Sequence, residues 1–463
     1  MNQHAAIQTG NAKAPHTNLG ISAKSSDTAT GQGLQGGNHA KLASKVERFL
    51  LLRMSQSLVY DRNLSANAQK RVCWCHRTIV SPAADVGVFR VQDGSNARLS
   101  GVSTCGSVWH CPVCAAKITE ARREELQAAM VSHIARGNGA AYLLTLTFPH
   151  EADHPLPELM ERFAKALKTF KESSQYKRIL GKDGSAARLG SVRSLEVTVS
   201  LENGWHPHTH DLLFCQRNGL EEIMFDGAAR LDDAGDLDSG PIQELKASWV
   251  KQLLRAGLGD QSKLTWMMER ALNVRGGEYA AQYIAKFGRD ERWGPSSELT
   301  RPHSKIGVAF EAEGITHFTP FQLLTWSMNG DGWAANRFRD YAEAFQGKRM
   351  LSWSPGLKRA LLSNDNEESD EQLAAAPMRE EAWIGQLTDD QFQVLLTRNK
   401  TGEFLRYVAE CCTDTSCAQI DINDYIAALK EIPATHGSAY RQKRLFRGDQ
   451  DLGQYIVVED HRT

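Results

Sequence analysis

The sequence predicts an α+β fold. Two observations support this prediction, and the length of the chain bounds the number of domains. Apolar and β-branched runs that are typical of strands occur among amphipathic segments of helical period. The strands expected at 190–200 and 205–214 follow one another across a Glu-Asn-Gly turn, which favours an antiparallel hairpin. At 463 residues the chain can form two or three domains with sizeable cores. We therefore expect helices combined with an antiparallel hairpin, and additional segments at both ends.

The composition is ordinary for a globular protein, with 41% hydrophobic and 24% charged residues. The formal net charge of -1 does not by itself indicate a nucleic-acid partner, but acidic segments can mask a local basic surface. The sequence contains no apolar run of membrane-spanning length and does not begin like a signal peptide. We therefore expect a cytoplasmic protein without a membrane segment.

The first segment, 1–44, is rich in Gly, Ala, Ser, Asn and Thr, and it has too few aromatic or β-branched residues to bury much surface. We expect a disordered leader here. Order is expected to begin near Lys45, where apolar residues from Val46 to Met54 follow a helical pattern.

The next segment, 45–115, combines this helix with a cysteine-rich element. The chain has nine cysteines, five of them at Cys73, Cys75, Cys105, Cys111 and Cys114. Without an export signal, metal binding is favoured over disulfides. Cys111 and Cys114 have the spacing of a zinc turn, and Cys105 with either Cys73 or Cys75 would complete a structural zinc site.

Other interpretations of the cysteines remain open. His76 and His110 are alternative ligands, so the sequence does not define the ligand set. The cysteines could instead be reduced and buried without a metal. A redox dithiol is a third interpretation, although no βαβ pattern surrounds Cys111 and Cys114.

Helices and strands are then expected in a regular order along the chain. A helix to about Ile134 is followed by a strand at 141–148 that ends at Pro149. Leu159, Phe163, Leu167 and Phe170 define an amphipathic helix. After the hairpin we expect a helix at about 241–256, a strand at about 263–271 and a helix at about 277–287.

Three histidines lie at alternate positions in the second strand of the hairpin. His206, His208 and His210 would project from one face of the sheet, as residues two apart in a strand do. Glu196 on the first strand is expected roughly opposite His210. Two imidazoles and one carboxylate would leave open positions on Mg²⁺ or Mn²⁺. The alternative is a polar strand with a solvated glutamate, and a register slip of one residue would turn Glu196 to the other face.

A second group of candidate residues lies on the helix expected at 277–287. Tyr279 and Tyr283 are four residues apart and share one helical face, with Lys286 on nearly the same side. Tyrosine can act as a covalent nucleophile, and an ammonium group can balance the charge of a phosphate. Glu278 points away from this face. The alternative is an amphipathic helix with two core tyrosines and a surface lysine.

Together these motifs resemble those of rolling-circle plasmid replication initiators in the HUH endonuclease superfamily. The segment from Leu144 to Thr147 resembles the first family motif, 206–210 the metal-binding motif, and 279–286 the nucleophile motif. The cysteines between Cys105 and Cys114, and the segments 317–324 and 339–357, resemble one plasmid branch. The resemblance covers about residues 70–362.

The resemblance implies an antiparallel sheet flanked by helices, with the histidines on a central strand. It implies that His208 and His210 hold Mg²⁺ or Mn²⁺, with His206 beside them, and that Tyr283 attacks the scissile phosphate. The products would be a 5′-phosphotyrosine link and a free 3′-OH. Thr209 stands where the family usually has a bulky hydrophobic residue.

How strand transfer ends stays open, because Tyr279 stands where some plasmid members have a glutamate. Either Tyr279 or a water activated by Glu278 could complete the reaction. The implied partners are origin DNA, single-stranded at the nick site, and host replication proteins such as a helicase. A single-strand transposase, a relaxase and a non-catalytic zinc-dependent DNA-binding regulator are the alternatives.

On this interpretation 116–362 is a nicking and joining domain with a C-terminal extension. We expect an acidic linker at 363–387 and a small α-helical region at 388–463. Thr388 and Gln391 form a predicted capping box at the first of its helices, and Asp421 is expected to cap a later one.

Overall fold

A five-stranded antiparallel sheet forms the centre of the computed structural model, which describes residues 31–80, 85–137, 139–216, 240–276, 280–281, 284, 317–362, 368–434, 440–447 and 450–459. The strand order is β7-β4-β6-β5-β8, and every neighbouring pair is antiparallel. The strands are β4 (Gly139–Leu146), β5 (Arg188–Ser200), β6 (Gly204–Gln216), β7 (Leu272–Arg275) and β8 (Leu351–Trp353). The α+β prediction is confirmed, and β6 with its three histidines is the central strand.

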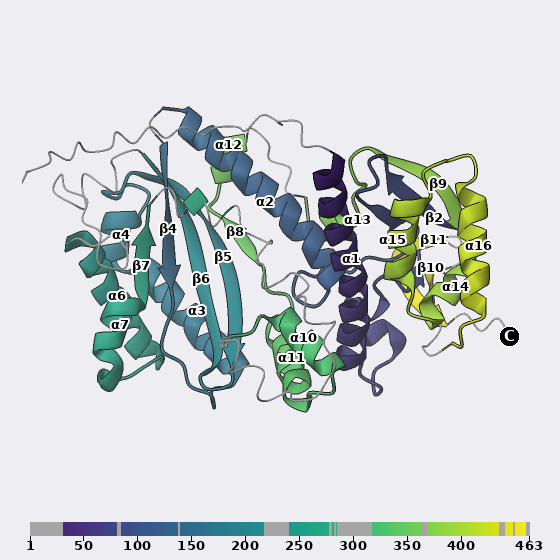
Figure 1. Cartoon of the computed structure of the whole chain (residues 1–463). Helices are drawn as coiled ribbons and strands as arrows, with labels where there is room; N and C mark the ends of the chain where they lie inside the picture. Colours follow the sequence, from purple (N-terminus) through teal and green to yellow (C-terminus); the bar gives the residue numbers. More distant parts are fainter. Residues whose placement is uncertain are drawn as a thin grey trace, which may run out of the picture.

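Helices cover both faces of this sheet (Figure 1). On one face α3 (Leu156–Glu172) packs against α6 (Gly240–Ala256), beside α4 (Ser174–Leu180) and α7 (Leu264–Arg270). On the other face lies α2 (Pro112–Ala135), whose His133 ring contacts Phe214. Alternation along β6 puts Phe214 on the same face as the histidines, so α2 covers one end of the histidine face.

The amphipathic pattern of α3 determines how this helix packs. Leu159, Phe163, Leu167 and Phe170 are buried as predicted. Phe163 and Phe170 both contact the buried ring of Trp249 on α6. Burying a side chain of this size contributes about 1.5 to 3 kcal/mol, so these contacts hold α3 and α6 together behind the sheet.

The hairpin register differs from the expected one by two residues. Ser200 lies opposite Gly204, and Glu196 therefore lies opposite His208, not His210. Gly204 has a φ of +67°, the left-handed conformation that closes a short hairpin loop, so it joins the ladder. Because side chains alternate with a period of two, a shift of two residues leaves Glu196 on the histidine face.

The strand expected at 263–271 is wrong. This stretch forms a 3-10 turn, η3 (Gln261–Lys263), followed by α7, and the strand β7 begins only at Leu272. Asp260 caps the turn by accepting a hydrogen bond from Ser262 N, and α7 contains Leu, Met, Glu and Arg, which favour helices. The helix expected at about 241–256 is confirmed as α6. Most of the helix expected at 277–287 lies outside the described residues.

The two ends of the described chain fold together as a second unit, on the right in Figure 1. Strands β2 (Val86–Val91), β3 (Ala97–Leu99) and β9 (Glu381–Leu387) form a sheet of order β3-β2-β9. Helix α1 (Gly31–Val59) packs against α15 (Thr401–Cys411), and Arg53 donates to the Leu396 carbonyl at 2.8 Å. This unit also contains α14 (Asp389–Thr397) and α16 (Ala418–Lys430).

Helix α1 begins at Gly31, inside the segment expected to be disordered and well before Lys45. Leu42, Phe49 and Leu52 of this helix are buried. Adding a residue to an existing helix costs far less than nucleating one, so a helix anchored by these side chains can extend into a sequence of low propensity.

The expected acidic linker at 363–387 contains α13 (Asp370–Ala375) and β9. Ser369 and Gln372 form a capping box for α13, and Ile384 and Leu387 of β9 are buried. The segment that was expected to be an acidic linker therefore contains a short strand, β9, whose buried apolar side chains are part of the second unit.

The C-terminal region is not wholly helical, because it includes β10 (Tyr440–Arg447) and β11 (Gln450–Glu459). Strand β10 pairs with β1 (Thr78–Ile79). The capping box at Thr388 is confirmed, whereas the last helix begins at Ala418 rather than at Asp421.

Two helices contact both units: α10 (Pro320–Met328) touches α1 and β5, and α11 (Gly332–Ala344) touches α1 and α3. The remaining short elements are η1 (Ala66–Ala68), η2 (Arg71–Trp74) and α12 (Leu357–Leu362). In the part of the chain that the structure describes, no helix has the length and apolar character needed to cross a membrane.

Candidate metal centres

The first candidate centre lies on the hairpin of β5 and β6. One ligand atom each of Glu196, His208 and His210 lies within 4.8 Å of the other two. Oε2 of Glu196 is 3.5 Å from Nε2 of His208 and 3.7 Å from Nε2 of His210. Two ring nitrogens therefore converge on one carboxylate oxygen, an arrangement that could hold a divalent cation.

Hydrogen bonds on the far side of each ring orient these nitrogens. Nδ1 of His208 donates to the His206 carbonyl at 3.1 Å, so its Nε2 carries the lone pair. Nδ1 of His210 shares a hydrogen bond of 2.9 Å with the hydroxyl of Thr145, which lies directly opposite on β4. A second partner of this kind fixes ring orientation at metal sites.

The structure shows what the segment from Leu144 to Thr147 does, which the sequence alone did not. Its two threonines form hydrogen bonds with histidines of β6. Thr145 and Thr147 point to the histidine face, and Thr147 hydrogen-bonds to Nε2 of His206. Because Nε2 is occupied in this way, His206 is not part of the converging group. Only the pairing of β4 with β6 brings these side chains together.

His206 instead forms part of a stack of imidazole rings. Its ring lies 4.6 Å from that of His150 and 4.8 Å from that of His208, close to parallel with both. Burial, reinforced by the neighbouring histidines, lowers the pKa of His206 to about 2. Sequence reasoning did not single out His150, whose Nδ1 donates to the Asn203 carbonyl at 2.6 Å.

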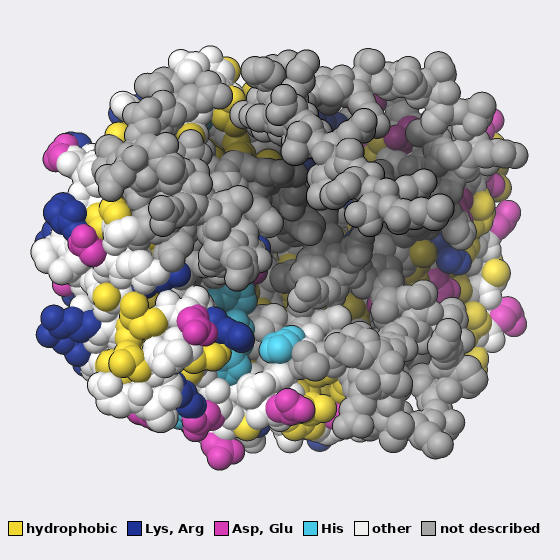
Figure 2. Space-filling view, turned by 60° about the vertical axis from the view of Figure 1, so that its left-hand side comes forward, with side chains coloured by type: hydrophobic (Ala, Val, Ile, Leu, Met, Phe, Trp, Pro, Cys, Tyr) yellow, Lys and Arg dark blue, Asp and Glu magenta, His cyan; other side chains and the backbone are white. Residues whose placement is uncertain are grey.

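The protonation state of His210 and the exposure of Glu196 both favour binding of a cation by the converging group. Burial lowers the pKa of His210 to about 4, although Glu196 opposes this shift. Its ring is therefore neutral at neutral pH, as ligation requires. The Glu196 side chain is 38% exposed, and Figure 2 shows histidine side chains at the surface of the molecule. The described residues therefore leave the centre partly exposed.

The opposite face of β6 is closed. Thr209 and Asp211 are buried there, and the Asp211 carboxylate lies 2.9 Å from Arg193 Nε and 3.5 Å from Lys171 Nζ. Slipping β6 by one residue would remove this carboxylate from its two cations. Asp211 therefore stabilises the register that presents the histidines.

The second candidate centre consists of Cys75, Cys105, Cys111 and Cys114. The Cys75 sulfur lies 3.7 Å from that of Cys111 and 3.5 Å from that of Cys114, and 3.7 Å separates Cys105 from Cys114. A tetrahedron with metal–sulfur bonds of about 2.3 Å has sulfur–sulfur edges of roughly 3.8 Å. Four thiols at this spacing could hold one metal ion.

Of the two cysteines that could complete this group, Cys75 does so and Cys73 does not. The alternative histidines are also outside it. Nε2 of His110 donates to the Ala342 carbonyl at 2.8 Å, and the ring of His76 packs edge-on against Phe49.

Backbone amides point at the sulfur atoms. Cys105 N donates to Cys75 Sγ at 3.4 Å, and Cys114 N donates to Cys111 Sγ at 3.3 Å, where Cys111 caps α2. Burial raises the pKa of the Cys75 and Cys111 thiols, whereas hydrogen bonds from the other three thiols lower the pKa of Cys114. Amide donors and a helix N-terminus both favour thiolate.

The residues of the predicted nucleophile motif, Glu278, Tyr279, Tyr283 and Lys286, lie outside the described residues. Their neighbours Ala280 and Ile284 are helical and buried.

Comparison with known proteins finds similarity to replication proteins. A family model described as "Replication protein" matches residues 96–222, which include the loop from Cys105 to Cys114 and most of the central sheet. The chain is 28% identical over 333 residues to "Protein rep" of Streptomyces lividans, covering 63% of this chain and 71% of that protein. It is 31% identical over 151 residues to "Neomycin resistance protein" of Streptomyces cyanogenus, covering 28% and 34%. No solved structure matches the chain significantly.

Proposed function

We propose that the chain is a plasmid replication protein that starts rolling-circle replication by nicking and rejoining one strand at the plasmid origin. Its similarity to the replication-protein family model and to "Protein rep" supports this proposal. The observation that carries this proposal is the convergence of two imidazole nitrogens and one carboxylate on the central strand of an antiparallel sheet. Their open side would admit a phosphate. The same arrangement supports assigning the sheet to the HUH endonuclease fold.

In this proposal His208, His210 and Glu196 hold Mg²⁺ or Mn²⁺, with Thr145 orienting His210. The ion would supply positive charge to the oxygens of the scissile phosphate. Hard cations of this kind accept carboxylate and imidazole ligands and keep free positions for a substrate.

Tyr283 is the proposed nucleophile. Its phenolic oxygen loses a proton and forms a bond to phosphorus, while the bond from phosphorus to the 3′ oxygen breaks. The leaving oxygen takes up a proton and becomes the 3′-OH that primes synthesis, and Lys286 balances charge on the phosphate. For termination, attack by Tyr279 and attack by a water activated by Glu278 remain the two options.

A single-stranded oligonucleotide that carries the origin nick site tests this proposal. We expect a covalent adduct that survives denaturation, that maps by mass spectrometry to Tyr283, and that disappears in Tyr283→Phe. The matched control, Tyr279→Phe, should still form the adduct. An adduct on Tyr279 alone would reverse the assignment, and the absence of any adduct would favour a non-catalytic DNA-binding regulator.

Termination requires a separate assay of circle release. If Tyr279 performs the second transfer, Tyr279→Phe should accumulate nicked intermediates without closed circles. Unchanged release in that variant, together with its loss in Glu278→Ala, would identify the water-based route.

The four-cysteine centre is proposed to hold structural zinc. Four thiolates at tetrahedral spacing suit Zn²⁺, and with four protein ligands no position remains for a substrate. We also propose that the protein acts in the cytoplasm on plasmid DNA, together with host replication proteins such as a helicase.

A further inference from the structure

A charged pocket of about 550 Å³ separates the cysteine-rich loop from the edge strand β8. Among the described residues, six cationic side chains line it: Lys70, Arg71, Arg122, Lys348, Arg349 and Lys358. Three described carboxylates, those of Glu368, Asp370 and Glu371, line it as well. The chain as a whole has a formal net charge of -1, so the excess of positive charge among these residues is local.

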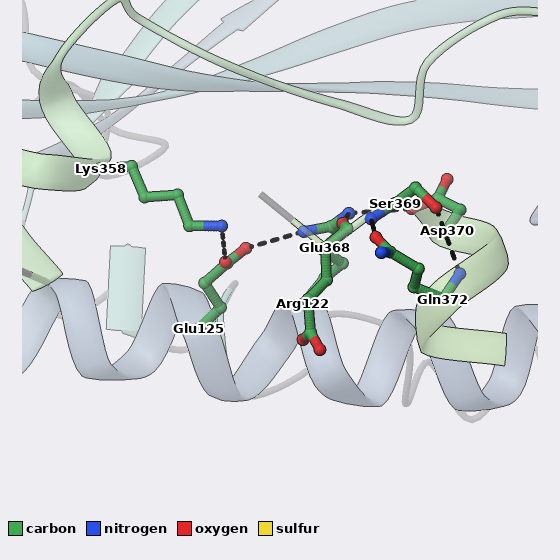
Figure 3. Close-up of polar contacts among 7 residues, drawn as sticks. All are labelled: Arg122, Glu125, Lys358, Glu368, Ser369, Asp370 and Gln372. Carbon is green, nitrogen blue, oxygen red and sulfur yellow. Dashed lines mark hydrogen bonds and ion pairs between the residues drawn. The ribbon is translucent and has the colours of Figure 1, made fainter. Parts of the chain in front are cut away.

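On one wall of the pocket, the cationic side chains of Arg122 and Lys358 already form ion pairs within the protein (Figure 3). Arg122 on α2 donates to Asp370 at 3.1 Å and to the Glu368 carbonyl at 2.7 Å. Lys358 pairs with Glu125, which Arg122 also contacts. The short segment from Glu368 to Glu371 therefore lies along a basic wall and neutralises part of it.

The other wall is different. Lys348 and Arg349 occupy the turn between α11 and β8, and both are exposed. Within the described residues, no recorded ion pair or hydrogen bond involves either side chain. Their backbone is nevertheless held, because Trp109 Nε1 donates to the Lys348 carbonyl at 2.7 Å. A fixed backbone with two uncommitted cationic side chains is suited to an external anion.

This turn also adjoins the histidine centre. Leu195 N donates to the Met350 carbonyl at 2.9 Å, and Leu351 pairs with Ser194. The backbone that leaves Arg349 therefore runs alongside β5 next to Glu196. Neighbouring strands are about 4.8 Å apart, so a polyanion in the pocket would need to extend only a short way to reach the metal ligands.

We propose that this pocket binds the phosphodiester backbone of the DNA strand that enters the histidine centre, with Lys348 and Arg349 contacting its phosphates. The segment from Glu368 to Glu371 borders the path and weakens binding by competing for Arg122 and Arg71. This inference rests on the proposed nicking function, because it assigns how the substrate of that reaction is held.

The test measures equilibrium binding of a fluorescein-labelled single-stranded oligonucleotide of mixed sequence to the full chain, in chelator, so that cleavage does not contribute. The double variant Lys348→Gln with Arg349→Gln should bind about tenfold more weakly at low salt. Because each lost phosphate contact lowers the slope of log K against log salt by about 0.7, the slope should fall by about 1.4. Thermal unfolding should be nearly unchanged, since both side chains are exposed.

A matched control removes two other exposed lysines. Lys165 and Lys251 line the groove between α3 and α6, on the opposite face of the sheet. Lys165→Gln with Lys251→Gln removes the same charge from the chain and should leave affinity and slope unchanged. Equal losses in both double variants would mean that only overall charge matters, and the assignment of the pocket would be wrong.

Removing carboxylates should have the opposite effect. Asp370→Asn with Glu371→Gln should tighten binding, because Arg122 and Arg71 then become available to the DNA. Pyrophosphate at matched ionic strength should not displace the oligonucleotide, and full displacement would reveal a small-anion site instead.

Nicking by the wild type, measured separately, keeps the two proposals apart. If the Lys348 and Arg349 double variant cleaves DNA and also binds it normally, the assignment of the pocket is wrong and the nicking function stands. If the wild type binds DNA through the pocket but never cleaves it, the nicking function is wrong and the pocket stands.

Discussion

The two candidate metal centres lie in one chain but differ in how completely the protein surrounds them. All four cysteines of the cysteine centre are buried, and Cys75 and Cys111 are fully inaccessible. In the histidine centre, the Glu196 side chain is 38% exposed, and three side chains converge within the described residues. A site with four protein ligands is complete without substrate, whereas one with three leaves room for it. On the proposed function, the cysteine centre would hold a metal for stability and the histidine centre a metal for chemistry.

The two centres also differ in what holds their ligands in place. The cysteines come from three separate segments: the end of η2, the loop at Cys105 and the start of α2. The histidines and Glu196 lie on one hairpin whose backbone ladder continues with or without an ion. We therefore expect loss of metal from the cysteine centre to damage the fold, and loss of metal from the histidine centre to damage activity.

The largest expected effect follows from Cys111→Ser. Binding of a structural metal contributes folding free energy, so its loss should lower the free energy of unfolding by on the order of 5 kcal/mol or more. Thermal unfolding and zinc content by mass spectrometry check this together. Cys73→Ser is the matched control, because Cys73 is buried outside the cluster and its variant should keep the zinc. Purified wild-type protein that unfolds cooperatively without zinc would contradict the interpretation.

His208→Ala should have the next largest effect, and on activity alone. An ion that stabilises several kcal/mol of developing charge is worth about a thousandfold in rate, so nicking should fall at least that far. DNA binding and thermal stability should be nearly those of the wild type. Full nicking activity in excess chelator would show that the centre does not act through a metal.

Thr145→Val should weaken the histidine centre without removing a ligand. It deletes the hydroxyl that holds Nδ1 of His210, and losing such a partner reduces metal affinity about 10- to 100-fold. Nicking measured against Mn²⁺ concentration should shift by that factor and recover at saturating metal. Thr147→Val, which affects only His206, is the control and should shift the curve less. A reduced maximal rate with unchanged metal dependence would assign Thr145 another role.

The smallest expected effect is that of Mg²⁺ on stability. At ten times its dissociation constant, an ion that binds only the folded state adds about 1.4 kcal/mol to the free energy of unfolding. Adding Mg²⁺ to metal-free Cys111→Ser protein should therefore not restore the stability lost with zinc. Full recovery of the melting temperature would remove the distinction between the two centres.

Much of the fold and of both centres could be predicted from local patterns. The helices α2, α3, α6 and α14 and the strands β4, β5 and β6 lie close to their predicted positions. The histidines share a face because a strand has a period of two, wherever the strand lies. Cys111 and Cys114 are close because two intervening residues at a helix start allow little else.

Other features depended on contacts between distant segments. The acidic stretch that was expected to be a linker supplies β9 to a sheet with β2. Its local composition was compatible with more than one conformation, and burial against a remote partner decided between them. Tertiary packing of this kind routinely overrides weak propensity. The stretch before β7 is a different case, because local residues that favour a helix form α7 where a strand was expected.

By itself, therefore, the sequence determined which residue types stand at metal-binding spacing and which face of a strand they share. Only the tertiary structure selected Cys75 over Cys73, paired Glu196 with His208, and placed Thr145 behind His210. The physical reason is the separation of the residues along the sequence. Spacing within one turn or strand follows from backbone geometry. The choice between partners tens of residues apart depends on how turns close and which surfaces are buried.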